Sequence, residues 1–267
     1  MSIPTNIGIE YTAYKNLDPK DYLAEYYTNI ILDEQLCLEF LTDSLRKILP
    51  ISVALEFGSG PVVSHLIPLT AKAQEIHVAD YLAGNCAEIE KWITKQPDAY
   101  NWRPFTLEIL RLEGNSNPTE AEAEKREQET RERITEVLFC DLTQPNPLGS
   151  QRREFYPLVT AHYCAEGISP DKDNWQAYMR NLTTLVKAKG VLIITACGST
   201  TAGSSGDFYR VGHQYYPLTK LNPQDILDCF RQNGFIDVDI RVRYLPDPGE
   251  QGYDCLIFAC GVKSVLV

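Results

Sequence analysis

The segment from Val53 to Pro61, VALEFGSGP, restricts the fold of this chain more than any other stretch. Its nearly unbroken apolar run, which carries one acid at Glu56, predicts a strand buried on both faces. Gly58 and Gly60 follow, and two glycines so close together predict a turn at which the backbone approaches a ligand. A strand and turn of this kind are typical of α/β folds that bind a nucleotide.

Two interpretations of the turn stay open at this point. A dinucleotide-binding fold requires a third small residue three positions after the second glycine, and Val63 occupies that position. Pro61 stiffens the turn and removes a backbone donor near the helix start that would hold a diphosphate. The turn alone is therefore compatible with a cofactor loop and with an ordinary connection between a strand and a helix.

Length and charge narrow the class of protein. A chain of 267 residues with 44% hydrophobic residues fits a single α/β domain, with a helical cap over residues 1–50 and a core over residues 51–267. The formal net charge is −11, and so acidic a surface repels phosphate backbones, so we expect no nucleic-acid binding. No stretch approaches the roughly 20 apolar residues of a membrane helix, and the N-terminus has no apolar leader. We therefore expect a cytoplasmic monomer that binds no membrane.

The cysteines and histidines show no pattern of a metal site. The eight cysteines include no Cys-x-x-Cys pair and lie mostly within apolar runs, which predicts buried reduced thiols. The four histidines are not spaced as metal ligands along the chain. The expectation is that the protein holds no metal.

Tyrosines crowd the segment between Glu10 and Tyr27, which also contains a helix start. Asp18 is suited to be an N-cap and Pro19 to be the first helical residue. The tyrosines are Tyr11, Tyr14, Tyr22, Tyr26 and Tyr27. Their rings either pack a peripheral helix onto the core or form a lid that closes over a ligand, and both interpretations stay open.

The rest of the chain alternates between strand and helix patterns. Apolar residues three and four apart predict helices at 29–49, 62–71 and 222–233. Buried strands are predicted at 53–57, 75–79, 135–140, 156–162 and 191–194, and a final antiparallel pair at 236–244 and 253–259. The polar stretch 113–133 predicts a solvated helix with the ion pairs Glu122/Arg126, Glu127/Arg131 and Glu129/Arg133. The loop 196–207 leads to Phe208–Arg210, which we expect to cover the site. Together these elements predict a seven-stranded, mostly parallel sheet.

Acidic residues follow several of the predicted strands. Asp80 ends the second strand and lies 20 residues beyond Gly60. An acid at this place in a nucleotide-binding sheet accepts hydrogen bonds from ribose hydroxyls. The alternative is that Asp80 caps the helix that contains Ile89.

Read together, the motifs resemble the small-molecule N-methyltransferase family that includes nicotinamide, phenylethanolamine and indolethylamine N-methyltransferases. The resemblance covers nearly the whole chain and rests on these segments, in order: Asp18–Leu23 with Tyr26 and Tyr27, Gly58–Pro61, Asp80 and Tyr81 with Asn85, Glu90–Trp92 with Trp102, Cys140–Thr143, and Ser169–Asp171. It implies a Rossmann-like class I methyltransferase fold with an N-terminal helical lid. It also implies that S-adenosylmethionine is the cofactor and S-adenosylhomocysteine the product.

The resemblance further implies which residues bind the cofactor. They are Gly58, Ser59 and Gly60 at the amino-acid portion, Asp80 and Asn85 at the ribose, Asp141 and Leu142 at the adenine, Tyr22 and Tyr27 at the methionine end, and Tyr14, Tyr81 and His162 as further contacts. One position departs from the family. Ser64 stands where the mammalian relatives have a tyrosine, so one aromatic contact is lost.

The acceptor side follows from the chemistry that the resemblance implies. Methyl transfer to an amine needs a positioned lone pair, and a protonated amine must first lose its proton to a base. Glu166 resembles the glutamate that faces the amine in the phenylethanolamine enzyme, so it is the candidate catalytic residue, although it could instead cap the helix after the fourth strand. The implied substrate residues are Tyr209, Tyr215, Glu166 and Asp254, of which Asp254 is near, but not aligned with, an acid of that enzyme. Ala196 stands where the nicotinamide enzyme has an aspartate, so we expect a small amine or nitrogen heterocycle other than nicotinamide.

Other functions remain compatible with the sequence. Displacement chemistry does not fix the acceptor atom, so transfer to oxygen or to a guanidine nitrogen stays open. A dinucleotide-dependent oxidoreductase is disfavoured by Val63 and by the terminal strand pair. A protein that binds the cofactor without catalysis is the third alternative.

Overall fold

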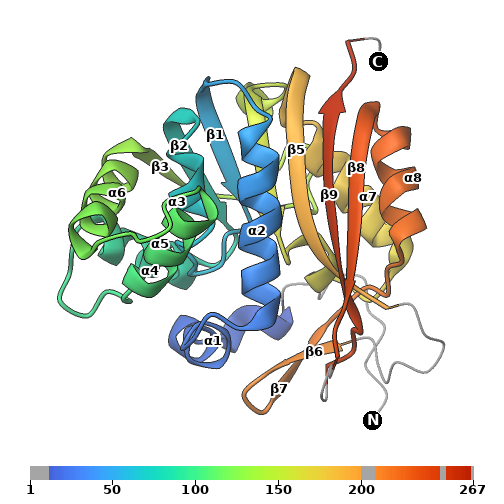
Figure 1. Ribbon diagram of the computed structural model, residues 1–267. Coiled ribbons are helices and arrows are strands. Elements are labelled where there is room, and N and C mark those ends of the chain that lie inside the picture. The colour runs from blue at the N-terminus through green and yellow to red at the C-terminus, as the bar shows by residue number, and fades with distance from the viewer. Residues whose placement is uncertain (1–11, 200–207, 247–250, 266–267) are drawn as a thin grey trace.

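A seven-stranded sheet forms the centre of the molecule (Figure 1). The computed structural model describes residues 12–199, 208–246 and 251–265. The strand order is β3-β2-β1-β4-β5-β9-β8. The strands are β1 (Ile51–Phe57), β2 (Ala73–Asp80), β3 (Ile134–Phe139), β4 (Tyr156–His162), β5 (Val186–Gly198), β8 (Phe235–Tyr244) and β9 (Cys255–Lys263). The first five run parallel, and β9 is antiparallel to both of its neighbours, which confirms the predicted sheet.

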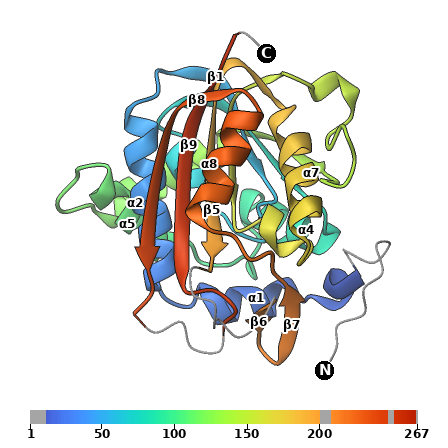
Figure 2. The ribbon, with the colours of Figure 1, turned by 90° about the vertical axis from the view of Figure 1, so that its right-hand side faces the viewer.

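Helices cover both faces of the sheet (Figure 2). The helix α2 (Leu32–Arg46) packs on one face, while α7 (Lys172–Thr183) and α8 (Pro223–Gln232) pack on the other. The remaining helices of the core are α3 (Leu66–Leu69), α4 (Ala83–Ile93), α5 (Arg103–Leu112) and α6 (Glu120–Arg133). The side chains form two hydrophobic clusters, one per face, and alternate residues of β1 enter each: Ala54 one, Leu55 and Phe57 the other. The apolar run in the sequence therefore reflects a strand that is covered on both sides.

A lid lies beyond the carboxyl ends of the parallel strands (Figure 1). It consists of residues 12–27, which include α1 (Pro19–Tyr26), and of a hairpin formed by β6 (Phe208–Val211) and β7 (Gln214–Pro217). The side chain of Asp18 caps α1 by accepting a hydrogen bond from the Lys20 amide, as predicted. The expected N-terminal helical lid is thus present, and the segment at 208–210 covers the site as part of a hairpin. Tyr11 and residues 200–207 lie outside the described residues.

Several predicted elements differ in extent from the observed ones. The helix predicted at 62–71 is reduced to α3, β5 begins at Val186 rather than at 191, and α5 was not predicted at all. The stretch 113–133 is not a uniformly solvated helix, because α6 begins at Glu120 and buries Ala123, Glu127 and Thr130. Of its three predicted ion pairs, only Glu127–Arg131 forms, at 3.4 Å. Arg126 instead pairs with Glu113, Arg133 donates to backbone carbonyls, and Glu122 caps the helix with Thr119. Arg126 and Arg133 thus bond to residues outside α6 and not to the glutamates predicted as their partners.

The predictions about the cysteines and about membrane-spanning helices can be compared with the structure. All eight cysteines are free thiols, five of them buried, as expected. Within the described ranges, none of the helices combines the length and the apolar character that crossing a bilayer requires.

Candidate functional site

The turn after β1 is held in a conformation that requires glycine. Gly58 and Gly60 have φ angles of +67° and +60°, in the left-handed region. A Cβ atom at Gly58 would lie 2.1 Å from the Sγ atom of Cys164, so no larger residue fits there without movement. The amides of Gly58 and Ser59 both donate to the carbonyl of Ala79, at 2.8 and 3.1 Å, which fastens the turn to the end of β2.

Asp80 joins this turn to the start of α4. Its Oδ2 atom accepts a hydrogen bond from the Gly60 amide at 2.8 Å, and Oδ1 accepts from the Leu82 amide at 2.8 Å and from Asn85 Nδ2 at 2.9 Å. The side chain is only 7% exposed, and this burial raises its pKa although the three hydrogen bonds oppose the shift. The carboxylate therefore organises the loop between β2 and α4 as well as the turn. The N-cap of α4 is Leu82 and not Asp80, and binding of a ribose by Asp80 stays a prediction.

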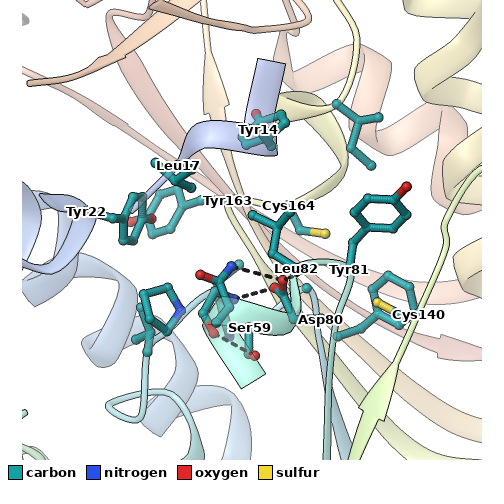
Figure 3. A pocket seen from close by; sticks show the side chains of 18 of the residues that line it. Tyr14, Leu17, Tyr22, Ser59, Asp80, Tyr81, Leu82, Cys140, Tyr163 and Cys164 are labelled. Atoms are coloured by element: carbon teal, nitrogen blue, oxygen red, sulfur yellow. Dashed lines mark hydrogen bonds between the residues drawn. The ribbon is translucent and has the colours of Figure 1, made fainter. Parts of the chain in front are cut away.

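A cavity opens above this turn and is called here the turn cavity. Its volume is about 110 Å³. Figure 3 shows Asp80 and Ser59 on one side of it and Tyr14 and Leu17 on the other. Eleven of the twelve residues expected to bind the cofactor line it: Tyr14, Tyr22, Tyr27, Gly58, Ser59, Gly60, Asp80, Tyr81, Asn85, Leu142 and His162.

Asp141 is the expected residue that does not line the turn cavity. Its Oδ1 atom accepts hydrogen bonds from the amide and hydroxyl of Thr143, at 3.0 and 2.6 Å, and Oδ2 accepts from Gln144 at 3.3 Å. The carboxylate is thus occupied by the turn that follows β3. Leu142, one residue further on, reaches the cavity wall instead.

A second cavity, called here the tyrosine cavity, adjoins the first beneath the lid. Its volume is about 60 Å³. Tyr22, Tyr27, Tyr163 and Tyr209 line both cavities and form the wall that they share. Its other lining residues are Tyr26, Ile31, Asp33, Glu34, Glu166, Gly167, Cys197, Leu218 and Tyr253.

Glu166 is a deeply buried carboxylate that lines the tyrosine cavity. It lies in a short 3-10 helix, η3 (Ala165–Gly167), directly after β4. Its Oε1 atom accepts a hydrogen bond from the Cys197 amide at 2.9 Å, and the residue is 3% exposed. Burial raises the pKa of its carboxyl group to about 7. Glu166 does not cap α7, because the N-cap of that helix is Asp171, and its role as a base stays a prediction.

Two residues predicted on the acceptor side do not line either cavity. Tyr215 is 59% exposed and packs against Phe208 on the outer face of the hairpin. Because side chains alternate along a strand, its neighbour Tyr216 faces inward, 2% exposed, and stacks on Tyr14 and Tyr209. The backbone of Asp254 bonds to Gly198 and Leu245 just before β9, while its neighbour Tyr253 lines the tyrosine cavity. The substrate roles of Tyr215 and Asp254 stay predictions.

Sequence reasoning also missed the carboxylates that α2 contributes. Asp33 and Glu34 lie in the first turn of α2 and both line the tyrosine cavity. Tyr253 donates its hydroxyl to Asp33 Oδ2 at 3.0 Å, and Tyr163 donates to the Asp33 carbonyl at 3.0 Å. Two adjacent acids at a helix start, just after the tyrosine-rich segment, were the signal available in the sequence.

A buried ionic network connects the two cavities. Glu34, in the tyrosine cavity, accepts a hydrogen bond from Ser64 at 2.7 Å and pairs with His65 at 3.1 Å. The other ring nitrogen of His65 lies 3.8 Å from Glu56 Oε1, and both histidine rings, His65 and His162, line the turn cavity. Ser64 thus fixes a carboxylate where the family has an aromatic ring.

The charges of this network are set by its burial and its pairing. Burial lowers the pKa of His65, but Glu34 and Cys37 together outweigh it and raise that pKa well above its usual value. Burial, together with the neighbouring His65, lowers the pKa of His162 well below its usual value, and burial raises that of Glu56 to about 7. His162 Nε2 and Glu56 Oε1 have no hydrogen-bond partner among the described residues. The rings of the two histidines lie 4.4 Å apart, a convergence that their spacing along the chain did not predict.

Comparison with known proteins finds relatives in sequence and in fold. The NNMT/PNMT/TEMT family model matches residues 7–251. Nicotinamide N-methyltransferase of Homo sapiens is 28% identical over 231 residues, which cover 84% of this chain and 84% of that protein. Indolethylamine N-methyltransferase of Mus musculus is 32% identical over 186 residues, which cover 67% of this chain and 69% of that protein.

A solved methyltransferase structure has a similar fold. The magnesium protoporphyrin IX methyltransferase of Synechocystis PCC 6803 with bound SAM superposes with a TM-score of 0.57 at 13% identity, covering 99% of this chain and 100% of that one. This likeness confirms the Rossmann-like methyltransferase fold.

Proposed function

This chain belongs to the NNMT/PNMT/TEMT family, and from this premise we propose that it transfers a methyl group from S-adenosylmethionine to a nitrogen of a small amine or heterocycle in the tyrosine cavity. One observation carries the proposal. A second cavity, lined by carboxylates and tyrosines, adjoins the turn cavity across a shared tyrosine wall. The protein is thus an S-adenosylmethionine-dependent N-methyltransferase whose acceptor lies beside Glu166.

The residues of the turn cavity fit this cofactor. Asp80, 7% exposed, ends β2 where ribose hydroxyls are bound in such folds. The buried Nε2 atom of His162 has no protein partner among the described residues and is available to a polar group of the amino-acid portion. Tyr22 and Tyr27 present aromatic rings at the methionine end of the cofactor, which suits its positively charged sulfur. When bound, S-adenosylmethionine supplies a methyl group already activated on that sulfur.

The chain's own residues contribute positioning, exclusion of water and a base. The shared tyrosines and the lid enclose the space between the two cavities, and such enclosure orders the reactants. Glu166 Oε1 is held by the Cys197 amide, which leaves Oε2 as the atom that takes the proton of an incoming ammonium group. A base with a pKa of about 7 is matched to this task at neutral pH.

The acceptor is expected to differ from nicotinamide. Ala196 lies within β5 and is 2% exposed, so its side chain offers no hydrogen-bond acceptor for a carboxamide. Transfer to an oxygen or a guanidine nitrogen is distinguished by the product and not by the geometry of the cavity.

A mass-spectrometric screen tests the proposal. The protein and S-adenosylmethionine are incubated with panels of amines, nitrogen heterocycles, guanidines and phenols, and each acceptor is examined for the mass gain of one methylene. Methylated amine or heterocycle is expected, and Glu166→Gln is expected to reduce it. Methylation of phenols or guanidines alone, or thermal stabilisation by NAD but not by S-adenosylmethionine, would overturn the proposal.

A further inference from the structure

We propose that the acceptor is a small dicationic amine whose methyl-accepting nitrogen lies beside Glu166 while a second, positively charged nitrogen lies beside Asp33. This inference rests on the proposed function, because it concerns the acceptor of the same methyl transfer. It names Asp33 as a residue that determines specificity.

The lining of the tyrosine cavity selects against anions. Its described residues include three carboxylates, Asp33, Glu34 and Glu166, and no lysine, arginine or histidine. Glu34 is already balanced, because Ser64 and His65 each bond one of its oxygens. Among the residues that the structure describes, no cation pairs with Asp33 or Glu166, so a positively charged ligand would balance both carboxylates.

Asp33 and Glu166 come from different elements of the fold. Asp33 lies in the first turn of α2 on one face of the sheet, and Glu166 follows β4 beside the hydrophobic cluster of the other face. Both line the tyrosine cavity, and each has its own hydrogen-bond donor, the Tyr253 hydroxyl for Asp33 and the Cys197 amide for Glu166. Two separated carboxylates suit two cationic groups better than one.

Both carboxylates retain capacity to accept hydrogen bonds from a ligand. Asp33 is fixed by one hydrogen bond from the Tyr253 hydroxyl, and Glu166 by one from the Cys197 amide. Each carboxylate can accept several bonds, and both residues line the cavity, so further bonds are available to a ligand there. The bond from Tyr253 thus holds the Asp33 carboxylate in place to accept a hydrogen bond from a ligand.

The tyrosines offer their ring faces, because their hydroxyls are engaged elsewhere. Tyr26 donates to the Arg210 carbonyl, Tyr163 to the Asp33 carbonyl at 3.0 Å, and Tyr209 to the Tyr14 hydroxyl at 3.0 Å. Aromatic faces attract ammonium groups. The cavity volume of about 60 Å³ exceeds several-fold the roughly 10–15 Å³ that one water occupies, which suits a small acceptor.

Matched pairs of acceptors test the inference. A series of linear diamines of increasing length is compared with the linear monoamines of equal carbon number, both by kcat/KM and by calorimetric binding in the presence of S-adenosylhomocysteine. We expect at least one diamine to bind about tenfold more tightly than its monoamine, the factor typical of one hydrogen bond to a charged group. Asp33→Asn is expected to remove this preference, whereas Asp43→Asn, an exposed acid on the same helix, is expected to keep it.

Three results overturn the inference. They are the absence of any diamine preference in the wild-type protein, an equal loss for monoamines and diamines in Asp33→Asn, and a loss in Asp43→Asn as large as that in Asp33→Asn. Should Asp33→Asn fold poorly, Tyr253→Phe keeps the charge and is expected to retain the preference, and its loss there would count against the role of the charge. The binding arm needs no turnover, so diamine-selective binding without methylation would contradict the proposed function and the assignment of the ligand as an acceptor, and would leave standing only the binding of the second charge by Asp33.

Discussion

Replacing Glu166 by Gln should raise the stability of the protein above neutral pH while lowering its activity. Glu166 is 3% exposed, and its ionised form has one hydrogen bond from another residue. Gln keeps an oxygen that can accept the same bond from the Cys197 amide but carries no charge. The substitution therefore isolates the consequence of ionising this group in a buried site.

The magnitude follows from the pKa. Burial raises the pKa of Glu166 from its ordinary value of 4.5 to about 7, which corresponds to about 3 kcal/mol at ~1.36 kcal/mol per pH unit. Because the pKa is higher in the folded than in the unfolded protein, the stabilisation is complete below pH 4.5 and is lost as the pH rises through 7. The free energy of unfolding of Glu166→Gln should exceed that of the wild type by up to about 3 kcal/mol above pH 7, and by progressively less toward acid pH.

Two assays on the same variant separate stability from catalysis. Urea unfolding of the protein without ligands, from about pH 5.5 to about pH 8.5, gives the difference in stability, and product formation gives turnover. We expect turnover to fall by about 10²-fold or more, the usual contribution of a general base, with little change in cofactor affinity. Glu124→Gln, on the exposed side of α6, is the control and should change neither quantity.

Parallel stability curves for the wild type and Glu166→Gln would refute the reasoning about burial. Undiminished turnover across the pH range would refute the role as a base and would leave Glu166 with the task of shaping η3.

Three further substitutions probe the turn cavity and the buried network. Asp80→Ala should weaken S-adenosylmethionine binding by about tenfold or more, because it removes a hydrogen-bonded carboxylate, and calorimetry measures this. Gly58→Ala should lower the free energy of unfolding by at least about 1–2 kcal/mol, because its φ is +67° and the new Cβ meets the Cys164 sulfur. His65→Gln should cost roughly 3–5 kcal/mol in urea unfolding, because it leaves the Glu34 carboxylate buried without its cation.

Each of these has a control. Gly149 also has a positive φ, +84°, but a Cβ there would meet nothing within 4 Å, so Gly149→Ala reports backbone strain alone and should be the milder change. Combining His65→Gln with Glu34→Gln should recover part of the lost stability, and an additive loss would argue against the ion pair. An unchanged dissociation constant in Asp80→Ala would remove this residue from the cofactor site.

The sequence was most informative where function depends on short stretches of backbone. The glycines at 58 and 60 and the acid at 80 could be predicted because parallel strands bring their carboxyl ends to one edge of the sheet. Tyr215 lies outside both cavities because side chains alternate along β7 and its own faces outward, which the sequence pattern did not reveal. Asp254 lies in the bend before β9, whose conformation no periodic pattern determines. Asp33 was not predicted, because its position depends on how α2 enters the core and on Tyr253, which lies 220 residues away.

The lid has a consequence for the timing of the catalytic cycle. Its two segments bind one another and the core: Tyr209 donates to Tyr14, Tyr14 donates to the Gly167 carbonyl, and Tyr26 donates to the Arg210 carbonyl. Because residues of both segments line the cavities, we expect these bonds to break before products leave. At roughly 0.5–1.5 kcal/mol each, three such bonds keep the open form a minor population. Turnover should therefore be limited by product release, and it should slow with solvent viscosity even when the acceptor is methylated rapidly.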